Sequence, residues 1–383
     1  MPKIVHITTV PQSLIFLTGQ VGFMQQQGLE IEAISSPGEQ LEQFGQKHGV
    51  KTHAIDMPRR ISPGADLIAL TRMITTLVKI KPDLVHAHTP KGGLLGMLAA
   101  TFAGVPRRVY HMRGLPLVTA TGKRRALLTW TERVSCALAS EVICVSHSLK
   151  HVATMHKLCP PHKMHVMLGG SGNGVDAATR FNPARQPKTI RQTIHATHKI
   201  PKNAVVVGFI GRLVRDKGIV ELTQAWRHIE KTHPNAHLLI VGPFEARDAV
   251  PEDIVQTLKS TPSIHLAGFQ RDTPAYYRAM DLVVLPTYRE GFPNVPLEAA
   301  AMGLPVVATD VPGCTDAVAD GQTGLLVPAQ DADALAQAIT TYLDDDALRQ
   351  QHGQAGQARV LKDFAPEGIW RGIHQLYEKL LTR

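Results

Sequence analysis

The chain turns from a strand into a helix along Asp281-Leu-Val-Val-Leu-Pro-Thr-Tyr-Arg-Glu290-Gly-Phe-Pro-Asn-Val-Pro-Leu-Glu298. A buried strand over residues 282–285 leads into a loop that carries Glu290. Asn294 is expected to cap the following helix and Pro296 suits its first turn, which places Glu298 near the amino end of that helix. Strand, loop and helix in this order are typical of a Rossmann-like unit, whose ligands bind at the carboxyl ends of the strands.

The same alternation of strand and helix extends in both directions along the chain. One series of short apolar runs lies at residues 3–8, 30–34, 84–87, 107–111 and 141–145, and a second at residues 204–210, 237–241, 265–267, 282–285 and 305–308. Such alternation predicts an α/β protein with two Rossmann-like domains, each a parallel sheet covered by helices, that face a cleft. The proline-punctuated stretch near residue 185 is predicted to join domains 1–185 and 186–365, and the apolar stripe of the helix in residues 366–383 could pack back on the first.

Composition describes a soluble globular enzyme, with 44% hydrophobic and 19% charged residues. The four cysteines form no CxxC pair, so neither a zinc site nor a disulfide framework is indicated. Residues 1–9 lack the features of an export signal, and the longest nearly apolar run, residues 94–105, is too short to span a bilayer. We therefore expect a cytoplasmic protein.

The formal net charge of +9 is unevenly distributed. Residues 1–180 hold 20 Lys and Arg against 10 Asp and Glu, whereas residues 181–383 hold 21 against 22. A basic half can bind nucleic acid, an anionic membrane surface or an acidic substrate. Because aromatic residues are only 5% and no helix-turn-helix, RNA-recognition or zinc-finger pattern is present, nucleic acid is disfavoured.

A phosphate-binding layout follows the strand at residues 204–210. Gly211 would let the backbone approach a ligand, Arg212 and Lys217 could neutralise a diphosphate, and a helix begins near Gly218. Taken alone, the same residues could form a surface turn with two solvated cations. Neither GxGxxG nor GxxxxGK[ST] occurs, so a dehydrogenase of the NAD type and a P-loop ATPase both lack their main signature.

Glu290 and Glu298 could be two catalytic carboxylates of a glycosidase, or ligands of a nucleotide sugar. A glycosidase needs carboxyl groups about 5 to 9.5 Å apart, whereas eight helical residues at about 1.5 Å each separate the two backbones by roughly 12 Å. Hydrogen bonds from the ribose hydroxyls to one carboxylate, with the phosphates on the neighbouring cations, suit the spacing better.

These features resemble the retaining glycosyltransferases of the GT-B fold, family 4. The resemblance rests on Gly211-Arg212 with Lys217-Gly218, on Glu290 and Glu298, and on the segments at residues 303–309, 312–313 and 320–328; the first domain adds residues 85–96, 110–116 and 173–176. Enzymes of this kind assemble bacterial capsule, exopolysaccharide and protein glycans.

The resemblance implies a role for each matching position. Catalytic residues would be Arg212 and Lys217 on the donor diphosphate, Glu290 on the donor sugar, and His111, at a strand end, on a sugar hydroxyl. Donor-binding residues would be Gly211, Phe292, Asn294, Leu297 and Glu298, with Glu298 on the ribose. Acceptor contacts would come from Thr9 and Gln12, although the usual amino-terminal Gly-Gly loop is replaced by residues 8–13. Apart from the resemblance, Lys91 and Gly92 after His88 could form an anion-binding loop for the diphosphate of a lipid-linked acceptor, or an ordinary loop. No metal or other cofactor is expected, since the two cations neutralise the leaving group.

The sequence departs from the resembling family at Pro293, which has no N–H to offer a phosphate, and at Pro312 in place of a glycine. Two further segments contain residue types that bind metals. The run Asp344-Asp345-Asp346 reads as solvated charge at a helix terminus. His86 and His88 lie one strand period apart and could share a metal, but no third ligand is apparent in the sequence.

Residues 122–133 combine Lys123, Arg124 and Arg125 with Leu127 and Trp130, which is typical either of a helix lying on an anionic membrane or of a core-packed helix with solvated cations. Residues 14–17 could likewise be core or a surface for an acceptor lipid. We expect peripheral contact with the cytoplasmic face of an anionic inner membrane. The function expected is transfer of a hexose or N-acetylhexosamine from a UDP-sugar to an undecaprenyl-diphosphate-linked saccharide; a nucleotide-sugar 2-epimerase of the same architecture is the alternative.

Overall fold

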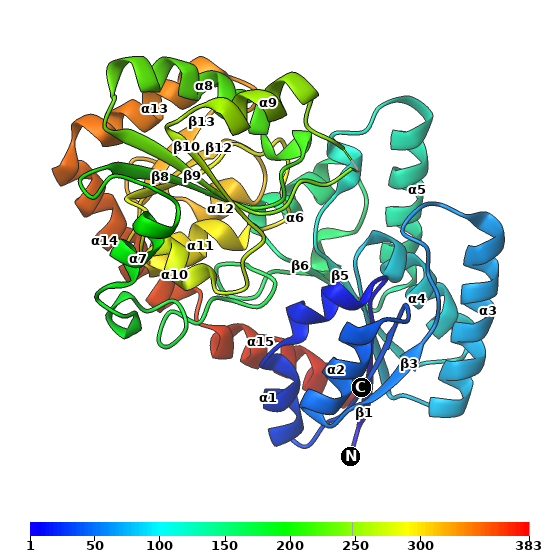
Figure 1. The fold of residues 1–383 in the computed structure, drawn as a ribbon. Coiled ribbons are helices and arrows are strands. Elements are labelled where there is room, and N and C mark those ends of the chain that lie inside the picture. Colours follow the sequence, from blue (N-terminus) through cyan, green and yellow to red (C-terminus); the bar gives the residue numbers. More distant parts are fainter. Residues whose placement is uncertain (247, 383) are drawn as a thin grey trace. The chain divides into compact units, whose positions relative to one another are not determined.

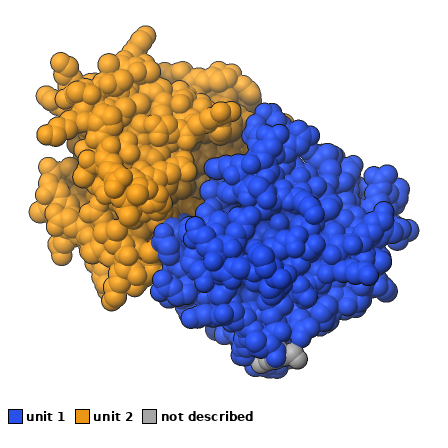
Figure 2. Space-filling model, turned by 90° about the horizontal axis from the view of Figure 1, so that it is seen from below, with its two compact units in different colours: residues 1–174, 366–383 blue, residues 175–365 orange. Residues whose placement is uncertain are grey.

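The computed structural model describes residues 1–246 and 248–382. The chain divides into two compact units, which Figure 2 colours separately: unit 1 is residues 1–174 with 366–383, and unit 2 is residues 175–365. The boundary expected between residues 185 and 186 falls inside unit 2, because Val175, Ala177 and Phe181 are buried in the core of that unit.

Unit 1 is built on a seven-stranded parallel sheet with the strand order β3-β2-β1-β4-β5-β6-β7. The strands are β1 Lys3–Ile7, β2 Glu30–Ser35, β3 Lys51–Ala54, β4 Leu84–His88, β5 Arg107–Met112, β6 Glu141–Cys144 and β7 Met164–His165. The α-helices are α1 Gln20–Gln26, α2 Glu39–His48, α3 Pro63–Ile80, α4 Pro90–Phe102, α5 Gly122–Leu138, α6 His147–Met155 and α15 Pro366–Leu381. Short 3-10 helices lie at η1 Pro11–Leu17, η2 Pro116–Val118 and η3 Pro161–Lys163.

Unit 2 repeats this plan with a six-stranded parallel sheet in the order β10-β9-β8-β11-β12-β13. The strands are β8 Val205–Ile210, β9 Ala236–Val241, β10 Ile264–Gly268, β11 Leu282–Leu285, β12 Val306–Thr309 and β13 Gly324–Val327. The α-helices are α7 Ile190–Thr197, α8 Ile219–Thr232, α9 Glu252–Ser260, α10 Thr273–Tyr277, α11 Asn294–Ala301, α12 Cys314–Ala317, α13 Ala332–Asp344 and α14 Asp346–Asp363, with 3-10 helices η4 Pro183–Arg185 and η5 Arg215–Lys217. The predicted fold class, two Rossmann-like α/β domains with parallel sheets, is confirmed.

Figure 1 shows that each unit has its own sheet with helices around it. Each sheet reverses its strand order at one point. In unit 1 the reversal lies between β1 and β4, and in unit 2 between β8 and β11. Loops that leave neighbouring parallel strands in opposite directions open a crevice at the carboxyl ends of those strands, and ligands of open α/β sheets bind there. The fold therefore marks one candidate position in each unit.

Ten strands were predicted, and all ten are present with bounds that differ by at most two residues. The sequence missed β3, β7 and β13, and all three are edge strands. Strand β3 is polar and partly exposed, and β7 has only two residues, so neither carries the apolar run that identifies a buried parallel strand. Strand β13 is a run of four residues inside the motif at residues 320–328, and the sequence analysis predicts no separate strand there.

The final helix, α15, belongs to unit 1 rather than to the unit that precedes it in the chain. Its apolar stripe, Ile369, Ile373, Leu376 and Tyr377, is buried in the core of unit 1 with residues of β1, β4 and β5. The indole N–H of Trp370 donates to Asn173 Oδ1 at 2.7 Å. The last helix thus contributes side chains to the interior of the first unit.

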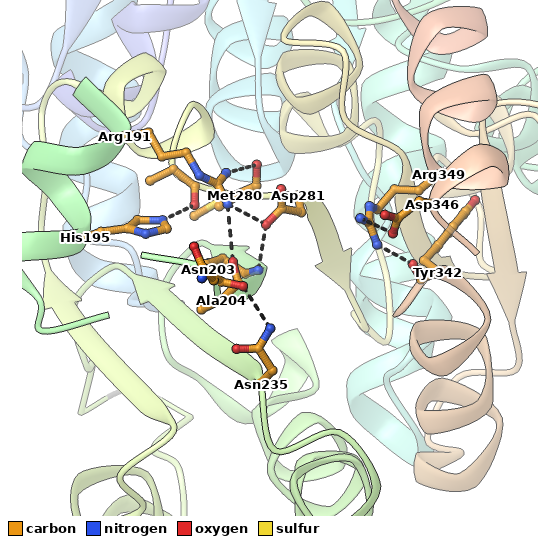
Figure 3. Close-up of polar contacts among 12 residues, drawn as sticks. Arg191, His195, Asn203, Ala204, Asn235, Met280, Asp281, Tyr342, Asp346 and Arg349 are labelled. Atoms are coloured by element: carbon orange, nitrogen blue, oxygen red, sulfur yellow. Dashed lines mark hydrogen bonds and ion pairs between the residues drawn. The ribbon is translucent and has the colours of Figure 1, made fainter. Parts of the chain in front are cut away.

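A polar clamp ties the amino ends of β8 and β11 together in unit 2 (Figure 3). Arg191 of α7 pairs with the Asp281 carboxylate at 2.8 Å and also donates to the carbonyls of Ala204 and Met280, each at 3.4 Å. The second contact of that carboxylate is the backbone N–H of Val206, at 2.7 Å. The clamp fixes the two strands whose opposite ends form the crevice of unit 2.

Candidate active site

Three loops of unit 2 converge at the carboxyl ends of β8, β11 and β12, which are neighbours in the sheet. They are residues 211–218, 286–293 and 310–313. The first contains η5 and leads into α8, the second leads into α11, and the third leads into α12. The segments singled out in the sequence therefore meet at the switch point of this sheet.

Two glycines let these loops approach one another more closely than any other residue would allow. Gly218 has φ 71°, and a Cβ there would lie 1.9 Å from the carbonyl oxygen of Pro286. Gly313 has φ 84°, and its Cβ would lie 2.5 Å from the carbonyl oxygen of Gly291. A real Cβ atom could not occupy either position without moving the opposite loop, so the two glycines set the width of the crevice.

Hydrogen bonds hold the loop after β11 against η5. The Thr287 hydroxyl and the Tyr288 N–H both donate to the carbonyl of Asp216, at 3.0 and 2.9 Å. The carboxylate of Asp216 pairs with Arg289 at 2.8 Å, and the Thr309 hydroxyl donates to the Thr287 carbonyl at 2.5 Å. Asp216 is thus a positioning residue that no sequence pattern indicated, because its contacts are to a loop about 70 residues away.

Lys217 and Glu290, which were predicted separately, form a short ion pair. Their side chains are only 19% and 16% exposed, so the pair is largely removed from water. Arg212 pairs with Glu245 at 2.8 Å in a more open position, with 50% of its side chain exposed. Both predicted phosphate ligands therefore lie at the carboxyl edge of this sheet, and each is paired with a carboxylate.

Glu298 lies in the second turn of α11 and accepts a hydrogen bond from the Tyr277 hydroxyl at 2.8 Å. Burial raises the pKa of Glu298, while the Tyr277 hydrogen bond and the charge of Arg180 lower it. The expectation that Asn294 caps this helix is wrong: Asn294 is the first helical residue, Pro293 occupies the cap position, and the helix has no side-chain cap. Pro296 does lie in the first turn, as predicted.

The other residues assigned to donor binding differ in what they can offer. Leu297 is completely buried, and Phe292 packs at 5.6 Å on the Phe364 ring, so both side chains belong to the core of unit 2. The Gly211 N–H already donates to the carbonyl of Val241 at 2.9 Å. Asn294 is exposed. Donor contacts from these positions remain a prediction, and Leu297 could contribute only through its backbone.

In unit 1, His111 is one of four histidines that gather at the carboxyl ends of β1, β4 and β5. His6 lies opposite His86 in the strand register, and His88 lies opposite His111. All four rings are buried, and their centroids lie 4.2 to 5.3 Å from their neighbours in the cluster. Burial, reinforced by the charge of Arg113, lowers the pKa of each, to about 3 for His6 and well below the usual value for the others. The cluster is therefore neutral at physiological pH.

His6 supplies the third histidine that the sequence did not reveal beside His86 and His88, because it lies on β1, about 80 residues earlier. The nearest ring nitrogens of these three lie within 4.8 Å of one another. Neutral imidazoles in such a group are able to bind a transition metal. The triple aspartate run does not resemble a metal site: Asp345 caps α14 at the Leu348 N–H, and Asp346 pairs with Arg349, as Figure 3 shows for the latter.

Thr9, Lys91 and Gly92, which are predicted to contact the acceptor, lie at the same edge of the unit 1 sheet, but their polar groups already contact other parts of the protein. Lys91 Nζ donates to the carbonyls of Pro58 and Arg60, at 2.5 and 2.6 Å, and pairs with Asp66 at 2.6 Å. The Gly92 N–H donates to Thr9 Oγ1 at 2.9 Å. The donors of Lys91 and Gly92 are therefore hydrogen-bonded within the protein.

The other acceptor position, Gln12, is exposed on η1. In the neighbouring apolar run, Leu14 and Leu17 are core residues, while Ile15 is exposed and Phe16 is partly buried. The core interpretation is confirmed for Leu14 and Leu17, while a lipid surface at Ile15 stays a prediction.

Helix α5 presents two different faces. Glu132 and Cys136 are buried towards the sheet, whereas Lys123, Arg124 and Arg125 are exposed. Leu127 and Trp130 are 41% and 60% exposed on the same helix. No helix within residues 1–246 and 248–382 is both long and apolar enough to cross a bilayer.

Two Rossmann-like units with these loops are the architecture expected of a GT-B glycosyltransferase, and comparison with known proteins shows that the chain is a glycosyltransferase. The family described as Glycosyl transferases group 1 matches residues 190–359, and the Glycosyl transferase 4-like domain matches residues 18–170. The chain belongs to this glycosyltransferase family.

A curated relative extends over the whole chain. The capsular polysaccharide biosynthesis glycosyltransferase CapM of Staphylococcus aureus is 34% identical over 379 residues, which cover 99% of this chain and 97% of CapM. The Escherichia coli enzyme named UDP-Gal:alpha-D-GlcNAc-diphosphoundecaprenol alpha-1,3-galactosyltransferase is 28% identical, with 76% of this chain and 74% of that enzyme covered. Among solved structures, Anabaena Alr3699/HepE in complex with UDP and glucose superposes with a TM-score of 0.82 at 20% identity, covering 99% of this chain and all of that one, which supports the fold alone.

Proposed function

We propose that this glycosyltransferase moves a hexose or N-acetylhexosamine from a UDP-sugar to an undecaprenyl-diphosphate-linked saccharide, with retention of anomeric configuration, during assembly of a bacterial surface polysaccharide. The observation that carries the proposal is the Lys217–Glu290 pair at the switch point of unit 2, beside Arg212. The relatives that act in capsule synthesis and on a diphosphoundecaprenol sugar support the choice of pathway and acceptor.

Unit 2 would bind the donor. The ribose hydroxyls would donate to Glu298, whose second partner, Tyr277, fixes the carboxylate. The diphosphate would take Lys217 and Arg212 from their present carboxylate partners, and Glu290, freed from Lys217, would accept hydrogen bonds from the donor sugar. Two positioned cations stabilise the negative charge that develops on the departing diphosphate, without a protein nucleophile and without a metal. The acceptor oxygen bonds to the anomeric carbon on the face that UDP leaves, the bond from that carbon to the diphosphate oxygen breaks, and the hydroxyl proton passes to the departing diphosphate.

The nucleotide and the sugar are tested by incubating the purified protein with UDP- and GDP-sugars and bacterial membrane extract, and measuring nucleotide release. Arg212→Ala and Lys217→Ala are each expected to lower kcat by about 100-fold or more, because each removes a charged donor from the developing anion. Lys231→Ala, an exposed lysine of the last turn of α8, is the matched control. Full activity in both active-site variants would rule out this mechanism, and the anomeric configuration of the product, read by NMR, tests retention.

The epimerase alternative needs no acceptor. A nucleotide-sugar 2-epimerase would convert a UDP-sugar to its epimer with the purified protein alone, whereas the transferase would release UDP only when acceptor is added. Analysis of the reaction without membrane extract therefore separates the two functions.

We further propose that α5 rests on the cytoplasmic face of an anionic inner membrane. Its three consecutive exposed cations and the exposed Trp130 are the combination that binds anionic lipid, at about 1 kcal/mol for each cation near the surface. Changing Lys123, Arg124 and Arg125 together to glutamine is expected to release the protein from phosphatidylglycerol vesicles in a sedimentation assay. Arg72→Gln, an exposed cation of α3, serves as control, and unchanged sedimentation of the triple variant would exclude this surface.

A further inference from the structure

The guanidinium of Arg113 is an uncompensated charge at the switch point of unit 1. It follows β5 directly, and its Nη2 is buried without a hydrogen-bond partner. Among the described residues, no carboxylate lies within ion-pair distance of it. Its other contacts are neutral: the Phe16 ring at 4.4 Å, the Gly172 carbonyl at 3.4 Å from Nη1, and His88 Nδ1 at 3.3 Å from Nε.

Burying a cation without a counter-charge is costly, and a ligand that supplies the missing charge would offset that cost. Burial lowers the pKa of Arg113 to about 9, which leaves the guanidinium charged at neutral pH. His111, two residues earlier on the same face of the strand, also has both ring nitrogens buried and without a partner. Unused donors of two side chains therefore lie at the position where the fold predicts a ligand.

The histidine cluster could hold a metal instead, but its hydrogen bonds argue against that. Because Arg113 can only donate, its contact with His88 leaves Nδ1 of that ring unprotonated, and the ring proton must lie on Nε2. His88 Nε2 then donates to His6 Nδ1 at 3.0 Å. One nitrogen of His6 and both nitrogens of His88 are thereby engaged within the protein, and the positive charge of Arg113 adjoins the cluster.

We infer that Arg113 binds a phosphate oxygen of the acceptor diphosphate, while His111 beside it keeps the predicted role on the donor sugar. The inference rests on the proposed function, because it names the group of the acceptor that unit 1 recognises. Lys91, the cation predicted for this role, already serves two carbonyls and Asp66, which leaves Arg113 as the cation with unused donors at this edge among the described residues.

A binding experiment tests the site without requiring transfer. The full protein is saturated with UDP, so that the donor site is filled, and is then titrated with inorganic diphosphate, or with glucuronate as a carboxylate probe, by calorimetry. Arg113→Gln is expected to weaken diphosphate binding by about 10- to 100-fold, the loss typical of one charge-assisted hydrogen bond, while Arg113→Lys retains part of the affinity. Arg107→Gln, at the amino end of the same strand, is the matched control and should bind as the unaltered protein does.

The outcomes separate the possible ligands. Diphosphate binding that is equal in the unaltered protein and in Arg113→Gln overturns the inference, as does tighter binding of glucuronate than of diphosphate. Stoichiometric Zn²⁺ binding that is lost in His86→Ala and strengthened in Arg113→Gln would also overturn it, in favour of a metal site. A purely structural arginine would destabilise the fold when removed; we expect the melting temperature of Arg113→Gln to be unchanged or raised.

A kinetic experiment connects the site to the reaction. With a diphosphate-linked acceptor, Arg113→Gln should raise the KM for acceptor and leave the KM for UDP-sugar unchanged; the reverse pattern would place Arg113 at the donor and overturn the inference. If no sugar is transferred at all but diphosphate binding still depends on Arg113, the proposed function fails while the anion site stands.

Discussion

Replacing Gly218 by alanine tests whether the loops at residues 211–218 and 286–293 approach one another as closely as the structure shows. Gly218 has φ 71°, and the added Cβ would lie 1.9 Å from the Pro286 carbonyl oxygen. A left-handed backbone costs a residue other than glycine about 1–2 kcal/mol, and forcing a methyl group into a packed position typically costs about 1–3 kcal/mol more. The two loops can relieve only the second cost, by moving apart.

Such a movement would carry Lys217, the preceding residue, away from Glu290, which lies on the loop that follows Pro286. Losing a charge-assisted contact of about 1.5–3 kcal/mol corresponds to roughly 10- to 100-fold weaker binding of UDP. We therefore expect Gly218→Ala to lower the stability of unit 2 by about 2–5 kcal/mol if the loops stay in place, or to weaken UDP binding by that factor if they separate.

Gly303→Ala is the matched control, because Gly303 has a similar φ of 78° but open space where its Cβ would lie. It should show the left-handed cost alone, with normal affinity for UDP. Urea unfolding and calorimetry of UDP binding on both variants separate the two effects. If Gly218→Ala matches Gly303→Ala in both stability and affinity, the close approach of the two loops does not exist and the reasoning fails.

Two further predictions concern buried carboxyl groups. Burial raises the pKa of Glu132 to about 7, although Tyr110 donates to it. The pKa of this carboxyl group in the unfolded chain is near 4.5, so the unfolded state releases its proton at lower pH than the native state does. The native state therefore loses up to about 3 kcal/mol of stability as pH rises from 4.5 to 7. Glu132→Gln should remove this loss of stability. The protection of β5 amides from hydrogen exchange, compared at equal pH, should therefore differ increasingly between the two proteins from pH 4.5 to 7. Protection that changes with pH in the same way in both proteins would contradict the prediction. For Glu298, Tyr277→Phe removes the hydrogen bond that lowers the raised pKa of this carboxyl group, so the pH below which UDP binding weakens should be higher in the variant. If calorimetry shows UDP binding weakening at the same pH in both proteins, the ribose is not bound by this carboxylate.

The fold could be predicted from the sequence because its strands are buried on both faces. Runs such as residues 282–285 are continuously apolar in a parallel sheet, and they alternate with helices of amphipathic sequence. Edge strands lack that signal: β3 is polar and partly exposed along its length, and beside its backbone pairing with β2 it has the polar contact of His53 with Glu32 at 2.7 Å. The sequence therefore revealed the interior of each sheet and missed three of the four edges.

The candidate site was predictable where it depends on positions along one loop, and not where it depends on partners. Gly218, Lys217 and Glu290 were found because spacing after a strand places them at a carboxyl end. Tyr277 on Glu298, Asp216 under the loop after β11, and His6 beside His86 join segments between about 20 and 80 residues apart. A single sequence contains no signal for such contacts until the order of the strands is known.

Charge compensation, finally, separates cations that look alike in the sequence. Lys91, Arg113, Arg212 and Lys217 all follow strands and all could bind a phosphate. In the structure, Lys217 and Arg212 each pair with one carboxylate, and an anion of higher charge can displace that carboxylate. Lys91 pairs with Asp66 and also donates to two backbone carbonyls, which are fixed in the chain and are not displaced. Arg113 faces no carboxylate among the described residues and keeps a buried nitrogen unused. A lysine or arginine at the carboxyl edge of a parallel sheet can therefore be held by backbone carbonyls, paired with one carboxylate, or left unpaired, and only the last two states leave a cation able to bind a substrate.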